Sequence, residues 1–463
     1  MLFRSGYHGL ALFWITGIHP MTWMGVPWFA SLLIAIFCWL FITFWGAALV
    51  VIWGVIMSSF TMLKLKQKSH FVSASLRLLI GVALWCVLEA IWSQGSLWWS
   101  SLSYTQSPGN LAILQLSQLS GPSTIVASIV LINGAIAEIL LYLKYSRRFQ
   151  WKAVCWLFLP LAFYSILYLI GLNLYNRPLN DIAQSAITVG IIQGNIPNEI
   201  KLYPAGWFKA IEGYTSGYQQ LAESEVELII TPETALPFLW TDIVTNSSLY
   251  PAILKQKKVA LIGAFGKQSD NFTNSLFTVN SDGSTFSRYD KVKLVPLGEY
   301  IPFKKFLGQF IKRLSPLDVQ LAAGNSHQIF DTPFGKAIVG ICYDSAFAEH
   351  FRRQTAAGGK FIITAANNAH YSPAMPAQHH AQDIMRAIES DRWLARATNT
   401  GYSAIINPKG ETFWISGINI YQLHQGVLYG RETKTLYVKW GDWLTFVLLM
   451  LATIAFFGSY TIA

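Results

Sequence analysis

The chain has 463 residues, of which 53% are hydrophobic and only 13% are charged, and its formal net charge is +10. This composition is too apolar for an ordinary soluble protein. Much of the Lys and Arg lies beside apolar runs, where membrane topology accounts for it, so the basic charge gives little support to nucleic-acid binding. Residues 1–175 and 441–463 hold long uncharged runs, whereas 186–440 reads as a globular domain. We therefore predict a membrane protein with one large insert.

Six apolar runs are candidate membrane spans, because a helix needs about 20 apolar residues to cross a bilayer. They cover residues 7–24, 27–57, 78–98, 123–143, 151–173 and 443–461. The first is marginal because it contains His8, His19 and Pro20, and an interfacial or re-entrant segment is the alternative. The run 27–57 is either one tilted helix or two spans. About five spans thus precede the insert.

The loops between these runs indicate the orientation of the chain. The segment 64–77 and the segment 144–152 are rich in Lys and Arg, whereas 99–122 contains neither. Basic loops stay in the cytoplasm. The run 151–173 then crosses outward, and we expect the insert on the outer face of the membrane.

The cysteines point to one position in the insert. Cys38, Cys86 and Cys155 lie inside candidate spans, where cysteine is usually a small apolar residue. Cys342 is the one cysteine in the insert, so the insert cannot contain an internal disulfide. Because an unpaired thiol on an oxidising face is a liability, its presence indicates chemistry.

The insert alternates short β-rich runs with turn signals. Strands are expected within 186–196, 226–237, 258–266, 275–291, 336–345, 360–369 and 401–416. Several runs are continuously apolar, which is typical of strands buried on both faces. Helices are expected at 206–223 and 378–397, and on the second Glu389 and Arg392 would share a face. "NSDGS" and "NPKGE" favour hairpins, and the whole pattern predicts a layered α/β domain.

Three polar residues follow buried runs: Glu233 after "ELIITP", Lys291 after "FSRYD" and Cys342 after "AIVGI". Strand ends hold reactive groups rigidly in α/β folds. In one pocket, the carboxylate would accept the thiol proton, the ammonium would stabilise an oxyanion, and the thiol would attack an acyl carbon. Each residue alone also has an ordinary explanation: a strand-capping Glu, a surface Lys, a small buried Cys.

The segments "TPETALP", "YDKVKLVPLGEYIPF" and "GICYDSAF" together resemble the nitrilase superfamily. "QGNIP" at 193–197, "LVPLGEYIP" at 294–302 and "RATNTG" at 396–401 are similar to the apolipoprotein N-acyltransferase family, a group of bacterial membrane enzymes. The resemblance covers almost the whole chain. It implies a multi-pass α-helical membrane domain in residues 1–175, an α/β nitrilase-like αββα sandwich in 186–440, and a C-terminal transmembrane helix.

The resemblance also implies roles for individual residues. Glu233 would be the base, Lys291 the oxyanion and orienting residue, and Cys342 the nucleophile. Supporting residues would be Glu299, Tyr343 and Asp344. Lys293 is the alternative lysine, but the spacing of Lys291 before "LVPLGE" fits the family better.

The chain departs from the family at several places. Asp344 stands where the family usually has Glu, and Leu202 where Trp is common. "ANNAHY" at 366–371 replaces a segment of the "NDAWF" type. The chain also begins at what would be the family's third span.

The implied reaction moves an acyl chain from a membrane phospholipid, through a thioester on Cys342, to the α-amine of the N-terminal diacylglyceryl-cysteine of an apolipoprotein. We expect a monomer in the bacterial inner membrane, with the catalytic domain on the periplasmic face and with no cofactor, metal or nucleic acid. One alternative is a membrane-tethered amidase or nitrilase that acts on a small amide. Another is a non-catalytic lipoprotein-binding relative.

Two further groups of polar residues have alternative explanations. His379, His380 and Asp383 could suggest a metal site, but adjacent histidines point to different sides of a helix, so we expect a surface or packing feature. Glu89 and Glu138 lie within candidate spans. The functional interpretation is that these carboxylates contact a lipid headgroup or a partner helix. The alternative is that they lie near the membrane interface or form hydrogen bonds inside the bundle.

Overall fold

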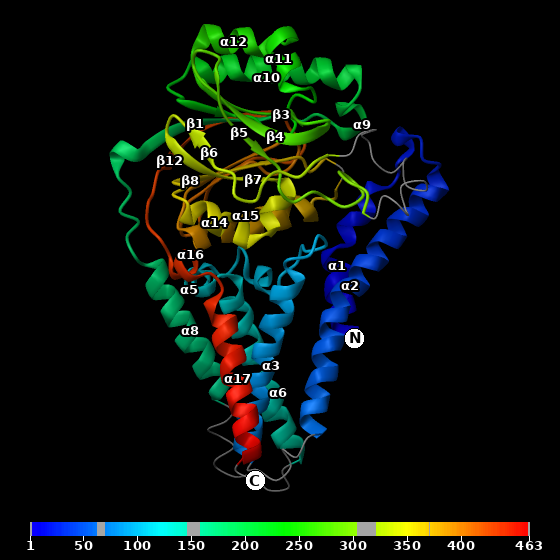
Figure 1. The fold of residues 1–463 in the computed structure, drawn as a ribbon, viewed down its shortest axis with the longest axis vertical. Helices are drawn as coiled ribbons and strands as arrows, with labels where there is room; N and C mark the ends of the chain where they lie inside the picture. Colours follow the sequence, from blue (N-terminus) through cyan, green and yellow to red (C-terminus); the bar gives the residue numbers. More distant parts are fainter. Residues whose placement is uncertain (1, 63–69, 146–157, 303–320, 370, 462–463) are drawn as a thin grey trace. The chain divides into compact units, whose positions relative to one another are not determined.

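The computed structural model describes residues 2–62, 70–145, 158–302, 321–369 and 371–461. The chain divides into two compact units. The helical unit comprises residues 1–12, 40–178 and 435–463, and the sandwich unit comprises 13–39 and 179–434 (Figure 1). Several features named in the sequence lie outside the described residues: Cys155, His370, the beginning of the segment 64–77, most of the segment 144–152 and the start of the run 151–173.

The helical unit is built mainly of helices, most of which are long and apolar. Those wholly within it include α1 (Leu2–Ala11), α3 (His70–Trp92), α6 (Pro122–Tyr145), α8 (Leu159–Tyr175) and α17 (Trp443–Thr461). Helix α2 (Trp28–Met62) has residues in both units. Within the described ranges, three helices are long and apolar enough to cross a membrane, and they lie in α2, α3 and α6; α8 and α17 contain shorter apolar stretches.

Two of the first three candidate spans differ from the helices of the structure. The run 7–24 is not one helix: α1 ends at Ala11, and two short 3-10 turns, Phe13–Ile18 and Thr22–Met24, follow it. Pro20 and the left-handed Gly25 disfavour continuous helix there. The run 27–57 forms one helix rather than two. The third helix begins and ends earlier than the run 78–98, at His70 and Trp92.

Both glutamates of the helical unit have partners inside it. Glu138 accepts two hydrogen bonds from Arg77, at 2.7 and 2.6 Å. Glu89 accepts from the indole of Trp85 at 3.1 Å and from the backbone N–H of Leu102 at 2.8 Å. Since buried charge is costly unless it is paired or hydrogen-bonded, these contacts favour hydrogen bonding inside the bundle over a lipid contact.

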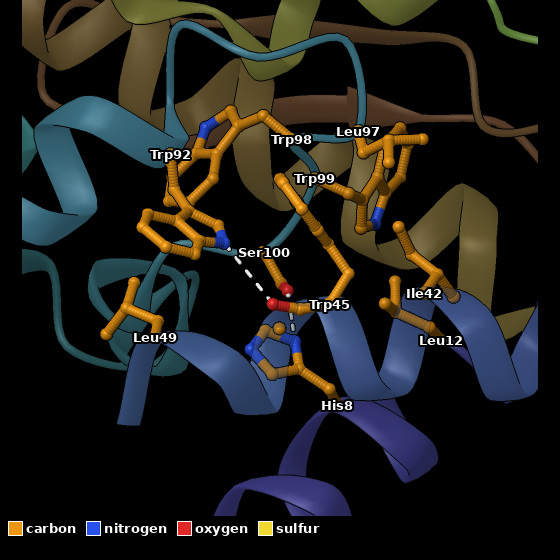
Figure 2. Close-up of a pocket in the computed structure, with 11 residues that line it drawn as sticks. His8, Leu12, Ile42, Trp45, Leu49, Trp92, Leu97, Trp98, Trp99 and Ser100 are labelled. Carbon is orange, nitrogen blue, oxygen red and sulfur yellow. Dashed lines mark hydrogen bonds between the residues drawn. The ribbon is translucent and has the colours of Figure 1, made fainter. Parts of the chain in front are cut away.

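A small cavity in the helical unit lies between α1, α2 and the end of α3 (Figure 2). In it, the His8 ring meets the Ser100 hydroxyl at 3.0 Å, and the Trp92 indole donates to the carbonyl of Trp45 at 3.3 Å. A Cβ at Gly46 would lie 2.2 Å from the His8 ring. A glycine at this position of α2 therefore allows the histidine to pack against the helix.

The sandwich unit is built on two stacked sheets, each of six strands in the described part of the chain. The first sheet has the order β12-β1-β2-β3-β4-β5 and the second β11-β10-β9-β8-β7-β6. The strands of the first sheet are β1 (Ala186–Gln193), β2 (Leu228–Ile230), β3 (Val259–Gln268), β4 (Asn271–Val279), β5 (Thr285–Asp290) and β12 (Gln422–Tyr429). Those of the second are β6 (Phe330–Thr332), β7 (Gly335–Ile341), β8 (Phe361–Ala366), β9 (Leu394–Thr398), β10 (Ala404–Ile406) and β11 (Thr412–Ile415).

Helices cover the outer face of each sheet. They are α10 (Pro204–Ala222), α11 (Trp240–Asn246) and α12 (Leu249–Gln256) on the first, and α14 (Ala348–Ala356) and α15 (Ala374–Ser390) on the second (Figure 1). Strand β2 shows why its run is wholly apolar: Leu228 and Ile230 pack between the sheets, whereas Ile229 packs under the helices. The fold is the expected αββα sandwich.

The second predicted helix, 378–397, is wrong at its end. Helix α15 stops at Ser390, Asp391 is left-handed with φ 53°, and strand β9 follows. Arg392 therefore does not share a helix face with Glu389, which pairs with Arg386 at 2.9 Å instead. The run that forms β9 is fully buried between the parallel strand β8 and the antiparallel strand β10. Its burial in the sheet outweighed its helical pattern.

Candidate active site

Three strand ends from both sheets carry the candidate residues. Glu233 lies three residues beyond β2, Lys291 directly follows β5, and Cys342 directly follows β7. Cys342 has a positive φ of 51° and Thr234, next to the glutamate, one of 46°. Non-glycine residues adopt this conformation at a cost, and such strain often marks functional sites.

One ammonium group binds two carboxylates in the site. Lys291 Nζ donates to Glu233 Oε1 and to Glu299 Oε1, both at 2.9 Å, and its side chain is 1% exposed. The amide of Asn274 donates to the same two oxygens, at 2.7 and 3.2 Å. Lys293 differs, because its ammonium lies 4.4 Å from the centre of the Phe347 ring. Lys291 is thus the lysine that meets Glu233.

The charges of the cluster set its protonation at rest. Burial and the nearby Glu233 raise the pKa of the Cys342 thiol to about 12, although Lys291 opposes the rise. Burial also disfavours a charged Glu233, but the charge and hydrogen bond of Lys291 hold the pKa of that carboxyl below its usual value. Burial raises the pKa of Glu299. The arrangement at rest is a neutral thiol beside an ionised carboxylate and a cationic lysine.

Two family-like segments and the divergent segment that contains Asn367 meet around Glu233. Its Oε2 accepts the backbone N–H of Asn367 at 2.8 Å. The Asn367 side chain donates to Asn198 at 2.8 Å and accepts from Asn399 at 3.0 Å. Asn399 also accepts the backbone N–H of Ile196 at 2.9 Å. Asn367 and Asn399 therefore link the "QGNIP" region to the loop beside the carboxylate through hydrogen bonds.

The supporting residues order the loops on either side. Asp344, fully buried, accepts the N–H of Lys293 at 2.7 Å with one oxygen and the N–H of Ile341 at 3.0 Å with the other. The second oxygen also accepts from the Tyr289 hydroxyl at 3.2 Å. Asp344 thus links the loop after Lys291 to the turn that contains Cys342. Tyr343 packs edge-on against the ring of Phe347.

Glu299 is held by its own loop as well as by the lysine. Glu299 Oε2 accepts the backbone N–H of Val295 at 2.8 Å, and the backbone N–H of Glu299 donates to the carbonyl of Val295 at 2.9 Å. The "LVPLGEY" segment therefore folds back on itself. This turn aims the carboxylate at Lys291.

Sequence reasoning missed two polar residues of the site. Lys201 is buried and donates to the backbone carbonyl of Glu233 at 3.1 Å, and burial lowers its pKa to about 8. Asn274 lies within strand β4 and bridges the two carboxylates. A signal existed for the second, since an amide inside a buried strand needs hydrogen-bond partners.

The two histidines of α15 diverge. His379 Nε2 lies 2.8 Å from the carbonyl O of Cys342, and His380 Nε2 lies 3.1 Å from the Thr412 hydroxyl. Asp383 pairs with Arg396 at 2.5 Å. All are buried, so of the two expectations the packing feature is correct and the surface feature is wrong. Across the described ranges, no group of three or more His, Cys, Asp or Glu could hold a metal ion.

Residues 188–425 match the carbon-nitrogen hydrolase family. A crystal structure of an amidase from Nesterenkonia sp. is similar at 16% identity and a TM-score of 0.42, over 58% of this chain and 98% of that one. The apolipoprotein N-acyltransferase of Nostoc sp. is 56% identical over 96% of this chain and 86% of its own length, and that of Synechocystis sp. is 50% identical over 97% and 88%. The chain belongs to the apolipoprotein N-acyltransferase family, whose catalytic fold is that of the carbon-nitrogen hydrolases.

Proposed function

We propose that this protein transfers an acyl chain from a membrane phospholipid to the α-amine of the N-terminal diacylglyceryl-cysteine of an apolipoprotein. The observation that carries the proposal is the buried cluster in which Lys291 binds both Glu233 and Glu299 close to the Cys342 thiol. A carboxylate base, a fixed cation and a thiol are the groups that acyl transfer through a thioester needs. Family membership supplies the acceptor and the membrane setting.

The first half-reaction acylates the thiol. Glu233 accepts the proton of Cys342, and Sγ attacks the ester carbonyl carbon of the phospholipid. Lys291 stabilises the developing oxyanion and remains a cation, because Glu233 and Glu299 raise its pKa well above the usual value although burial opposes them. The C–O bond then breaks, the lysophospholipid oxygen takes the proton from Glu233, and the acyl chain stays on Sγ.

The second half-reaction moves the chain to nitrogen. The acceptor α-amine attacks the thioester carbonyl, Glu233 takes a proton from that nitrogen, and the C–S bond breaks. The leaving sulfur recovers the proton, so the thiol and the carboxylate return to their starting states. The products are an amide and a free enzyme, and no oxidant or cofactor is required.

The direct test is to isolate the protein with phospholipid vesicles, without acceptor, and to examine the Cys342 peptide by mass spectrometry. We expect an acyl mass that neutral hydroxylamine removes, and we expect no such mass in Cys342→Ala. An acceptor lipopeptide should then discharge it as an N-acyl product. Absence of the acyl group, together with turnover of a small amide to acid, would instead support the hydrolase alternative.

We further propose that residues 186–440 form the catalytic domain on the periplasmic face of the inner membrane, that 1–175 and 441–463 anchor it, and that the chain acts as a monomer. The support is the basic segment 64–77 and the charge-free segment 99–122. Single cysteines placed at 105 and 246 should react with a membrane-impermeant maleimide from outside, and one at 144 should not. External labelling at 144 would overturn this orientation.

A further inference from the structure

The backbone of the nucleophile needs support that the triad does not give. Cys342 has φ 51°, in a region that residues with a side chain rarely occupy. Rotation of this residue toward ordinary φ values would swing its Cβ, and with it Sγ, away from the present direction. Contacts to the peptide groups of Cys342 therefore control where the sulfur points.

One of these contacts comes from helix α15. His379 Nε2 lies 2.8 Å from the carbonyl oxygen of Cys342. A carbonyl oxygen can only accept, so Nε2 carries the hydrogen in this contact. His379 is fully buried, and no solvent competes for the bond.

The other ring nitrogen is placed to keep that tautomer. The amide nitrogen of Asn368 lies 3.2 Å from His379 Nδ1, and Arg396 donates to the Asn368 oxygen at 3.4 Å. Because the guanidinium can only donate, it orients the amide with its nitrogen toward the imidazole. A neutral ring with hydrogen on Nε2 accepts at Nδ1, as this geometry requires.

Arg396, which begins this series of hydrogen bonds, is itself held in place. Arg396 is fully buried and pairs with Asp383 at 2.5 Å, and that carboxylate also accepts from the Thr364 hydroxyl at 2.7 Å. A Cβ at Gly401 would lie 2.3 Å from the Asn368 oxygen, so little room exists for the amide to turn. Burial and the Arg396 charge lower the pKa of His379 to about 3, although Asp383 and Glu233 act in the opposite direction. The imidazole is therefore neutral under working conditions.

We propose that His379 is a positioning residue for the nucleophile: its Nε2–H holds the carbonyl of Cys342, and Asn368 keeps the imidazole in the tautomer that can do so. The inference rests on the proposed function in taking Cys342 as the nucleophile. It assigns His379 no contact with substrate. Its effect is on the direction of Sγ, and a displacement of about 1 Å at a reacting atom can cost on the order of 100-fold in rate.

The test compares His379→Leu with His379→Gln. The leucine removes the donor, whereas the glutamine amide can place an N–H near the same carbonyl. We expect His379→Leu to slow single-turnover acylation of Cys342 about 100-fold with little change in KM, and His379→Gln to recover most of the rate. His380→Leu is the matched control, since it lies next on the same helix but faces Thr412, and it should acylate normally.

Alkylation of Cys342 by iodoacetamide, followed on its own peptide by mass spectrometry, separates this inference from the proposed function. The reagent reports the exposure and direction of Sγ even if phospholipid proves not to be the acyl donor. A change in His379→Leu that His379→Gln reverses supports the positioning role under either outcome. Wild-type rates in His379→Leu would overturn it, and so would equal losses in both variants with a matching fall in melting temperature, which would indicate a purely structural residue.

Discussion

Each unit of the molecule holds acidic and basic side chains in contact away from bulk solvent, but the two arrangements differ. In the helical unit, Arg77 meets Glu138 through two parallel hydrogen bonds, one guanidinium to one carboxylate. In the sandwich unit, Lys291 is shared between two carboxylates, Glu233 and Glu299. In the first arrangement, one guanidinium meets both oxygens of one carboxylate. The second divides one ammonium between two carboxylates near a thiol, which is the arrangement that the proposed general-base role of Glu233 requires.

Glu233→Gln should produce the largest change. The amide keeps the size of the side chain and can still accept from Lys291, but it cannot take the thiol proton. Because general-base assistance contributes roughly 100-fold to 10,000-fold, we expect Cys342 acylation to slow by that factor. The measurement is single-turnover thioester formation, with the exposed Glu212→Gln on α10 as control.

The same variant should separate acidity from catalysis. Glu233 is one of the groups that raise the pKa of Cys342, while Lys291 lowers it. Removing the carboxylate charge should therefore lower the thiol pKa, seen as alkylation that begins at lower pH, even as acylation slows. Normal acylation in Glu233→Gln would exclude this residue as the base.

Arg77→Met tests the pair of Arg77 and Glu138. It leaves the buried Glu138 without its guanidinium. Breaking a fully buried pair typically costs about 3 to 5 kcal/mol of stability, and because Arg77 is partly exposed we expect a loss below that range. The double variant Arg77→Met/Glu138→Met removes both charges and should return close to wild type. Unfolding in detergent micelles measures both. Equal instability of the single and double variants would contradict a pairwise role.

A variant of Asp344, in the turn that follows Cys342, should have a smaller effect. Asp344→Ala removes the acceptor for the N–H groups of Ile341 and Lys293 and so loosens both loops. We expect acylation to fall on the order of 100-fold, as for a misplacement near 1 Å. Asp344→Asn keeps the shape and one acceptor oxygen, and it should lose less. An alanine variant with full activity would show that the aspartate does not position the loops.

The sequence predicted where the strands lie far better than it predicted which side chains contact the residues at their ends. Glu233 and Cys342 each follow a buried apolar run, whereas Lys291 follows β5, whose residues are mostly exposed or half-buried. The structure brings Glu233 and Lys291 into direct contact. Helix α17 begins and ends where its apolar run does, because no other element competes for those residues. Periodicity failed at β9, where a buried parallel strand has the same apolar content as a buried helix end.

Other features depend on contacts between distant segments and have no local signal. Lys201 reaches the carbonyl of Glu233 across 32 positions of the chain, and His379 reaches that of Cys342 across 37. Nothing in the residues around either one indicates a partner. Family resemblance identified the segments that meet at the site, but only the fold shows which side chains join them.

His380→Gln tests a third kind of buried group: a side chain that stays neutral in the folded protein, unlike the paired charges of Lys291 and Arg77. Burial and Arg396 lower the pKa of His380 to about 4 from the usual 6.5, although Asp383 opposes them. As the pH falls below 6.5, the unfolded chain gains a proton at this position and the folded chain does not, so folding stability is lost between pH 6.5 and 4. The glutamine variant lacks this site and should lose about 2 kcal/mol less between pH 7 and pH 5. Unfolding midpoints across that range measure the difference, and parallel pH curves for the two proteins would show that His380 has the same pKa in the folded and the unfolded chain.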